Sequence, residues 1–314
     1  MSILWQSVSF IHKAINDNKK RFFFKTRHSV SEMWSTMPCQ NRLKKESDCL
    51  AVWYPGVPFY YIGWNEDMPF FSETSVRLAM TLSINREQIV SKLIKDQGRI
   101  VSGPFYINGT QNDSAIEPWP YDPERAKKLL DEAGWIDHDG DGIRDKNGVP
   151  FRFKYMIAAD LAIHEQIAKL VKDSAASVGI EVILDPYEGS VFFSKAHDRD
   201  FDAVSMGWGG NVEEDPYQIW HSSQIGNRGS NFVGFKNAEA DALIEQARQT
   251  LDPDKRNALY HKFHRILHEE QPYTFIYTKP EQRFLNKRFQ NVIMHKLGID
   301  EREWYVPANL QKYK

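Results

Sequence analysis

The 314-residue sequence is poor in cysteine, in net charge and in long apolar segments, and each shortage excludes a class of protein. Two cysteines, Cys39 and Cys49, are too few for a disulfide framework, and they leave both a single disulfide and two free thiols open. A net charge of −2 gives no basic footprint for nucleic acid. No apolar run is long enough to cross a membrane, and residues 1–16 are too polar for a signal peptide.

Several enzyme motifs are missing as well. The chain has no Walker phosphate loop, no GxGxxG fingerprint and no nucleophile elbow. His221, Ser222 and Ser223 supply a base and two hydroxyls, but neighbours in sequence rarely face one another productively. We therefore expect a protein that is not an enzyme and that carries no cofactor.

What the chain does contain is an ordinary globular balance, with 41% hydrophobic and 26% charged residues. Apolar residues alternate with polar ones over residues 151–157, which predicts a strand, and recur at helical spacing over residues 163–171. Further strands are expected at residues 180–184 and 202–206, with a short helix between them. This strand–helix order predicts an α/β fold with a largely parallel sheet.

Helix starts are marked by residues that cap free backbone N–H groups. The clearest signals are Asp122 and Asp252, each followed by proline, and Asn237. Asn85 with Gln88 forms a capping box, and Ser72 is expected to cap the helix before it. Residues 99–120 carry Gly, Asn and Pro and predict a long loop.

The stretch over residues 201–235 holds the strongest candidate site. A strand ends in Gly-Trp, mobile glycines follow, and three carboxylates precede an aromatic segment. This pattern fits a pocket for a cationic ligand end, and it equally fits an acidic turn over an aromatic core. The candidate ligand-binding residues are Trp208, Asn211, Glu213, Glu214, Asp215, Tyr217 and Trp220.

Two groups of possible metal ligands are present, and we predict no metal at either. The acids of the first have the spacing of a calcium loop, but Gly148 stands where the bidentate acid belongs, so a surface hairpin is expected. His261, His264 and His268 share one helix edge, away from the apolar stripe, and are expected to face solvent. The acids are Asp137, Asp139, Asp141 and Asp145.

Several motifs together resemble one family. They are YIGWN at residues 61–65, the segment 69–90, GWIDHDGDGIRDKNGVPF at residues 134–151, the Gly-Trp loop above and the segment 237–277. In this order they look like the extracytoplasmic solute-binding proteins that serve oligopeptide, dipeptide and nickel ABC importers. The resemblance implies a periplasmic-binding-protein-like fold, a location outside the cytoplasm, and delivery of a small peptide or similar solute to ABC permease subunits.

The resemblance also implies a division of the chain. Residues 66–278 would form the α/β ligand-binding lobe II, and residues 1–65 and 279–314 would belong to a partial lobe I. Strands near Tyr61 and Tyr277 would be the crossing segments between the lobes. Because family members are longer, the sequence resembles the C-terminal portion of such a protein, truncated at the N-terminus.

In the family, an acidic residue after the Gly-Trp strand pairs with the ligand's α-ammonium. Here Asn211 stands at the first loop position, and Glu213 and Asp215 lie nearest the Asp-Pro signature. The carboxylates are expected to hold the ammonium while the aromatic rings, Trp220 included, form an exposed inner face. Asp215 has an alternative role as a helix cap. The alternative function for the whole chain is a calcium-binding scaffold lobe that is not part of a transporter.

Overall fold

The computed structural model describes residues 49–54, 56–95, 97–226, 229–295 and 298–311. The expectation for Cys39 lies outside these residues. The chain divides into two compact units, which we call the terminal unit (Met1–Pro55 with Pro280–Lys314) and the central unit (Gly56–Lys279). Within the described part of the chain, no helix combines the length and the apolar character that crossing a membrane requires.

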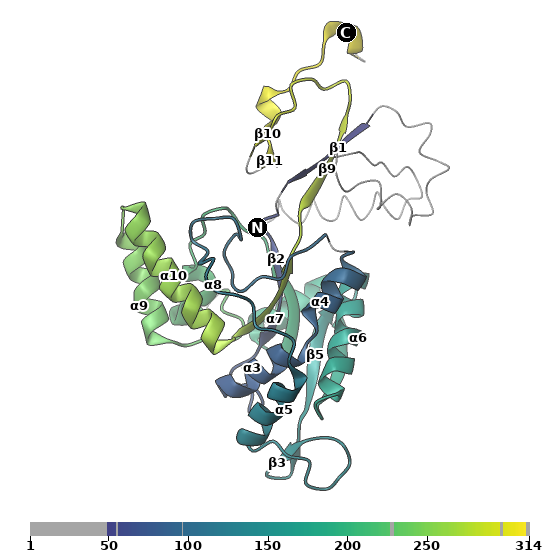
Figure 1. The fold of residues 1–314 in the computed structure, drawn as a ribbon, viewed down its shortest axis with the longest axis vertical. Helices are drawn as coiled ribbons and strands as arrows, with labels where there is room; N and C mark the ends of the chain where they lie inside the picture. The colour runs from purple at the N-terminus through teal and green to yellow at the C-terminus, as the bar shows by residue number, and fades with distance from the viewer. Residues whose placement is uncertain (1–48, 55, 96, 227–228, 296–297, 312–314) are drawn as a thin grey trace, which may run out of the picture. The chain divides into compact units, whose positions relative to one another are not determined.

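The central unit contains a five-stranded sheet surrounded by helices (Figure 1). Its strands are β2 (Phe59–Trp64), β5 (Arg152–Ala158), β6 (Glu181–Tyr187), β7 (Ala203–Trp208) and β8 (Tyr273–Thr278), with the hairpin β3 (Asp145–Lys146) and β4 (Val149–Pro150) beside it. Its helices are α3 (Thr74–Ser83), α4 (Arg86–Gln88) continued by the π-helical turn Ile89–Leu93, α5 (Pro123–Glu132), α6 (Ala162–Ala176), α7 (Gly189–Asp198), α8 (Tyr217–Trp220), the 3₁₀ turn Ser222–Gln224, α9 (Ala238–Gln249) and α10 (Pro253–Glu270).

The strand order of this sheet is β6-β5-β7-β2-β8. β5 pairs in parallel with β6 and with β7, as the alternation of strands and helices predicts. β2 runs antiparallel to both of its neighbours, β7 and β8. The sheet is therefore mixed, with four strands in one direction and β2 in the other.

β2 and β8 are the two strands through which the chain enters and leaves the central unit. They lie side by side, with Tyr60 opposite Tyr277 in the register and their rings stacked at 4.6 Å. β2 begins, and β8 ends, at the edge where β5, β6 and β7 also end; we call this the carboxyl edge. The sequence places β2 with residues 1–65, whereas its hydrogen bonds lie inside the central unit.

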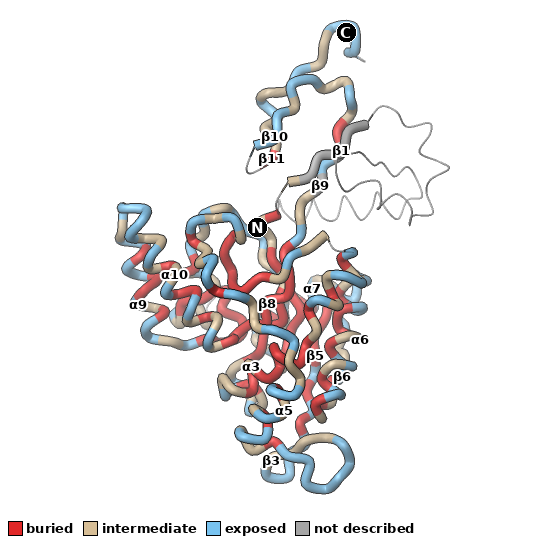
Figure 2. Tube along the Cα trace, in the orientation of Figure 1, coloured by how far each residue is buried: buried red, intermediate tan, exposed pale blue. Residues whose placement is uncertain are grey.

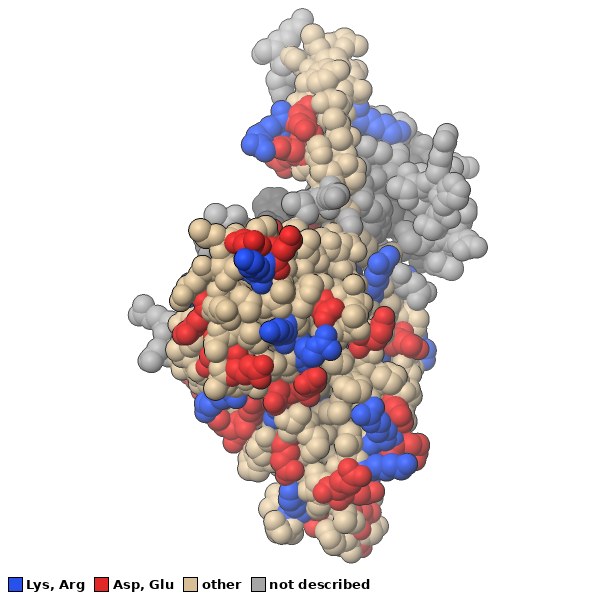
Figure 3. All heavy atoms as spheres, turned by 60° about the vertical axis from the view of Figure 1, so that its left-hand side comes forward, with Lys and Arg blue, Asp and Glu red and all other residues tan. Residues whose placement is uncertain are grey.

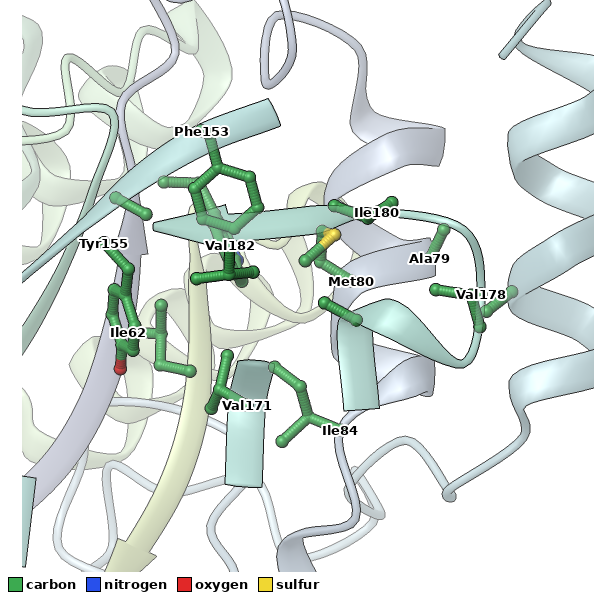
Figure 4. Close-up of a cluster of buried hydrophobic side chains, with 14 of the residues drawn as sticks. Ile62, Ala79, Met80, Ile84, Phe153, Tyr155, Val171, Val178, Ile180 and Val182 are labelled. Atoms are coloured by element: carbon green, nitrogen blue, oxygen red, sulfur yellow. The ribbon is translucent and has the colours of Figure 1, made fainter. Parts of the chain in front are cut away.

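Side chains alternate between the two faces of the sheet, so the unit has two cores. On one face α3, α5 and α6 pack over Ile62, Phe153 and Tyr155 (Figure 4). On the other, α7 to α10 pack over Tyr61 and Met156. Burial extends along β5 and β8, which Figure 2 shows mostly in red.

Most of the predicted helix starts are confirmed. Asp122 accepts a hydrogen bond from Arg125 N at 3.0 Å, and Asn237 and Asp252 each accept from two backbone N–H groups. Asn85 accepts from Gln88 N at 2.8 Å. The expectation for Ser72 is wrong, because its hydroxyl donates to a backbone carbonyl and the helix begins two residues later without a side-chain cap.

The terminal unit is described over two short sheets. β1 (Cys49–Tyr54) pairs antiparallel with β9 (Glu281–Asn286), and β10 (Met294–His295) with β11 (Gly298–Ile299). Tyr54 joins the first pair through its hydroxyl, which donates to Glu281 Oε2 at 3.0 Å. The short 3₁₀ turns Glu301–Glu303 and Ala308–Leu310 follow.

Glu66 is a buried carboxyl just beyond β2. Its Oε1 lies 3.8 Å from Arg77 Nη2 and makes no hydrogen bond with the described residues. Arg77 donates instead to the carbonyls of Glu270 and Phe71, at 2.9 and 2.8 Å. Because the ion pair is long, burial dominates and raises the pKa of Glu66 to about 7.

We expect Glu66→Gln to become more stable than the wild type as the pH rises. A carboxyl whose pKa is raised on folding contributes fully below its unfolded value of 4.5, and that contribution is lost as the pH rises through 7. Gln has the same shape and does not titrate. The free energy of unfolding of the variant should therefore rise by about 3 kcal/mol relative to that of the wild type. Urea denaturation from about pH 4.5 to about pH 8 measures it.

Glu132→Gln is the matched control, since Glu132 is exposed on the last turn of α5. Its difference from the wild type should stay flat over the same range. A flat difference for Glu66→Gln too would show that Glu66 is ionised and well solvated in the folded protein.

Candidate functional site

The Gly-Trp loop of residues 207–217 leaves the sheet at the carboxyl edge, directly after β7. In open α/β sheets this edge is where ligands bind. Gly209, Gly210 and Asn211 are exposed, and the chain returns to the core at Pro216 before α8. The loop therefore begins and ends in buried structure and presents its middle residues to solvent.

Trp208 is fixed by aromatic neighbours on both crossing strands. Its indole Nε1 donates to the Tyr273 hydroxyl at 3.3 Å, and its ring lies nearly parallel to Tyr61 at 6.4 Å. Tyr61 and Tyr273 stack at 3.7 Å, and Phe232 lies parallel to the indole at 5.6 Å. The half-buried indole is thus a rigid apolar surface at the carboxyl edge.

Glu214 is held by a residue that the sequence did not single out. Gln111 donates from Nε2 to the Glu214 carbonyl at 2.8 Å and accepts from the Glu214 N–H at 2.7 Å. The Glu214 carboxylate accepts from the Asn211 N–H, and burial raises its pKa. These contacts pin the middle of the acidic segment to the 99–120 loop.

The other two carboxylates form ion pairs with arginines on neighbouring helices. Glu213 Oε2 lies 3.5 Å from Arg256 on α10, and Asp215 Oδ2 lies 3.1 Å from Arg248 on α9. Asp215 Oδ1 also accepts from the Tyr217 N–H at 3.1 Å, but Asp215 lies one residue before the N-cap Pro216, and α8 has no side-chain cap. Both charges therefore have a partner within the central unit.

The two aromatic residues at the ends of α8 differ in exposure. Tyr217 is partly exposed, with the Arg248 guanidinium 4.3 Å above its ring and His221 stacked at 4.4 Å. Trp220 is 1% exposed and packs against Tyr273 at 4.4 Å. The expectation that Trp220 lies on an exposed face is wrong, because the single helical turn α8 points its indole into the core.

His221 and Ser223 meet, contrary to what their sequence spacing predicts. The Ser223 hydroxyl lies 2.8 Å from His221 Nδ1, but the Ser223 backbone N–H donates to the same nitrogen at 3.1 Å. Nε2 faces Glu245 at 3.3 Å. The imidazole thus caps the turn Ser222–Gln224, and its Nδ1 lone pair is already occupied.

His264 and His268 of α10 pack against the 99–120 loop, so the expectation that they face solvent is wrong for these two. His261 is partly exposed, with its Nε2 2.9 Å from the Thr110 carbonyl. His264 is 0% exposed; its Nδ1 accepts from the Asp113 N–H and its Nε2 lies 3.2 Å from the Ser102 hydroxyl. His268 stacks on Trp119 at 4.9 Å. Burial lowers the pKa of both histidines to about 4. They anchor the loop that carries Gln111.

The acidic hairpin lies at the opposite edge of the sheet, before β5. Asp137, Asp139 and Asp141 each place a carboxylate oxygen within 4.8 Å of the others, and all three are exposed. Each also accepts a hydrogen bond from the loop's own backbone, as when Asp137 binds Gly140 N at 2.8 Å and Gly142 N at 3.0 Å. The carboxylates thus satisfy turn geometry, as the hairpin interpretation predicts.

We expect millimolar calcium to leave the melting temperature of this chain unchanged. Without a bidentate acid the hairpin lacks two of the usual oxygen ligands, so binding to the folded state should add little stability. Differential scanning fluorimetry with calcium, and with magnesium as the control ion, measures this. A calcium-specific rise that disappears in Asp139→Asn would show that the hairpin is a calcium site.

We expect Gln111→Ala to loosen the Gly-Trp loop. Gln111 is 3% exposed, and its removal leaves the Glu214 N–H and carbonyl without their partner, which costs roughly 1–3 kcal/mol. Hydrogen exchange should accelerate at the Glu214 amide. Gln246→Ala, which removes an exposed amide on α9, is the control and should change neither quantity. Unchanged protection at Glu214 would show that Gln111 does not hold the loop.

The sequence and the fold of this chain are similar to those of known proteins. The model of bacterial extracellular solute-binding proteins, family 5, middle part, matches residues 31–230. The oligopeptide-binding protein AppA of Bacillus subtilis is 37% identical over 76% of this chain and 43% of its own length. The dipeptide-binding protein of Escherichia coli is 28% identical over 82% of this chain and 47% of its own.

The fold gives the same result. The structure of Bacillus subtilis AppA in complex with a nonapeptide superposes with a TM-score of 0.77 at 31% identity, covering 86% of this chain and 54% of that one. The chain spans about half the length of the curated relatives it matches. The α/β fold expected from the sequence is that of these binding proteins, and the chain belongs to family 5 of the bacterial extracellular solute-binding proteins.

Proposed function

We propose that this chain is part of the substrate-binding component of an ABC importer that takes up peptides. The observation that carries this is the likeness to Bacillus subtilis AppA, an oligopeptide-binding protein, over three quarters of the chain. Binding proteins of this kind capture a solute outside the cytoplasmic membrane and deliver it to permease subunits. No catalysed reaction is part of this function.

The proposed ligand-binding surface is the carboxyl edge of the central unit. Trp208 supplies a fixed aromatic face, Tyr217 a second ring, and the exposed segment from Gly209 to Asp215 supplies polar groups. Apolar walls with a few placed polar groups are typical of small-molecule sites. Trp220 supports this surface from the core through its contact with Tyr273.

We assign β2 and residues 66–278 to the ligand-binding lobe II, and the rest of residues 1–65, together with residues 279–314, to lobe I. The pairing of β2 with β8 supports this division, because both connections leave the central unit at one edge. A hinge of two adjacent strands allows two lobes to close over a ligand that is bound at that edge. Closure would bury the ligand on both sides.

We expect Trp208→Ala to weaken peptide binding by about tenfold or more. Removing the indole deletes most of an aromatic contact, worth at least about 1.4 kcal/mol. Isothermal titration of a peptide pool measures binding, and circular dichroism verifies folding. Tyr121→Ala, at an exposed aromatic outside the loop, is the control and should bind normally. Equal affinities of the Trp208 variant and the wild type would place the site elsewhere.

A further inference from the structure

The charges around the Gly-Trp loop nearly cancel. Arg256 lies beside Glu213 and Arg248 beside Asp215, so two carboxylates are matched by two guanidinium groups. On the face that Figure 3 shows, acidic and basic side chains are likewise interspersed. Exposed ion pairs add little stability, but they set the local field, and an arriving ammonium would meet positive and negative charge together.

The third carboxylate, that of Glu214, forms its hydrogen bond within the Gly-Trp loop. Glu214 Oε1 accepts from the Asn211 N–H and lies against Gly210, where an added Cβ would be 2.8 Å from it. The carboxylate is half-buried, and its backbone is held by Gln111. It therefore serves as a brace of the turn, leaving no unpaired carboxylate in the loop to receive a cation.

Asn211 is the polar side chain of this loop that stays available. It is exposed, and its amide makes no hydrogen bond with any residue that the structure describes. Gly209 and Gly210 precede it, so these two positions add no side chain of their own between Asn211 and the Trp208 indole. An amide offers one acceptor and two donors, which match the N–H and C=O of a peptide group but cannot neutralise an ammonium.

We infer that the Gly-Trp loop binds an uncharged stretch of peptide main chain through Asn211, and that it does not select for a free amino terminus. This inference rests on the proposed function and narrows its substrate class. The ligands are peptides whose chain continues past the loop or whose amino terminus is blocked. Trp208 lies under the bound segment, and Asn211 pairs with one of its peptide groups.

The test compares one peptide with a free amino terminus and the same peptide acetylated. At about pH 7 the free α-amino group is mostly protonated, so the pair differs by one charge. Isothermal titration of the wild type should give dissociation constants within about threefold of each other. Asn211→Ala should weaken both peptides equally, by on the order of threefold, because one neutral contact is lost.

Asn211→Asp puts a carboxylate at the same position and should favour the free peptide over the acetylated one by about tenfold or more. Gln246→Glu adds the same charge on the exposed face of α9 and should show no preference. A wild type that prefers the free peptide tenfold, or an Asn211→Asp variant without preference, overturns the inference while the proposed function stands. Failure of a folded wild type to bind either peptide overturns the proposed function and this inference with it.

Discussion

β2 is hydrogen-bonded along both of its sides, to β7 and to β8, and the candidate site depends on this double pairing. β7 ends in Trp208, and the indole is held by Tyr61 from β2 and Tyr273 from β8. The space around β2 permits little variation. At Gly63 a Cβ would lie 2.8 Å from Val233, so the strand fits beneath the segment that follows the loop only because the residue is glycine.

A second support reaches the loop from outside the sheet. His264 on α10 fixes the 99–120 loop, and Gln111 on that loop fixes Glu214. Each contact is at least partly buried and satisfies polar groups of both partners, so the loss of either contact would be costly. Burial is the main cause of the lowered pKa of His264, since it disfavours the charged imidazolium. The neutral imidazole can accept the Asp113 backbone N–H.

The features that the sequence predicts well are local ones. Asp122, Asn237 and Asp252 cap helices because their partners are two or three residues away. The features that it misses depend on distant partners. Gln111 lies 103 residues from Glu214, and His264 lies 162 from Ser102, so neither role leaves a mark in the spacing of nearby residues. Helical periodicity placed the α10 histidines away from the apolar stripe but could not show that another loop covers that edge.

The position of the site is a local feature that the sequence predicts, whereas its chemistry depends on distant partners. A strand that ends in Gly-Trp before glycines and acids indicates where a ligand surface lies, since strand ends and turns are local features. The charge of that surface depends on Arg248 and Arg256, which approach from two later helices. In the sequence, three consecutive acidic positions, Glu213 to Asp215, therefore predict an anionic site. In the fold, Glu213 and Asp215 form ion pairs with arginines, and Glu214 accepts a hydrogen bond from its own loop. A loop that is already held in place also has little entropy to lose when a ligand binds, so its affinity depends on how well the ligand matches the Trp208 surface and the few polar groups that remain.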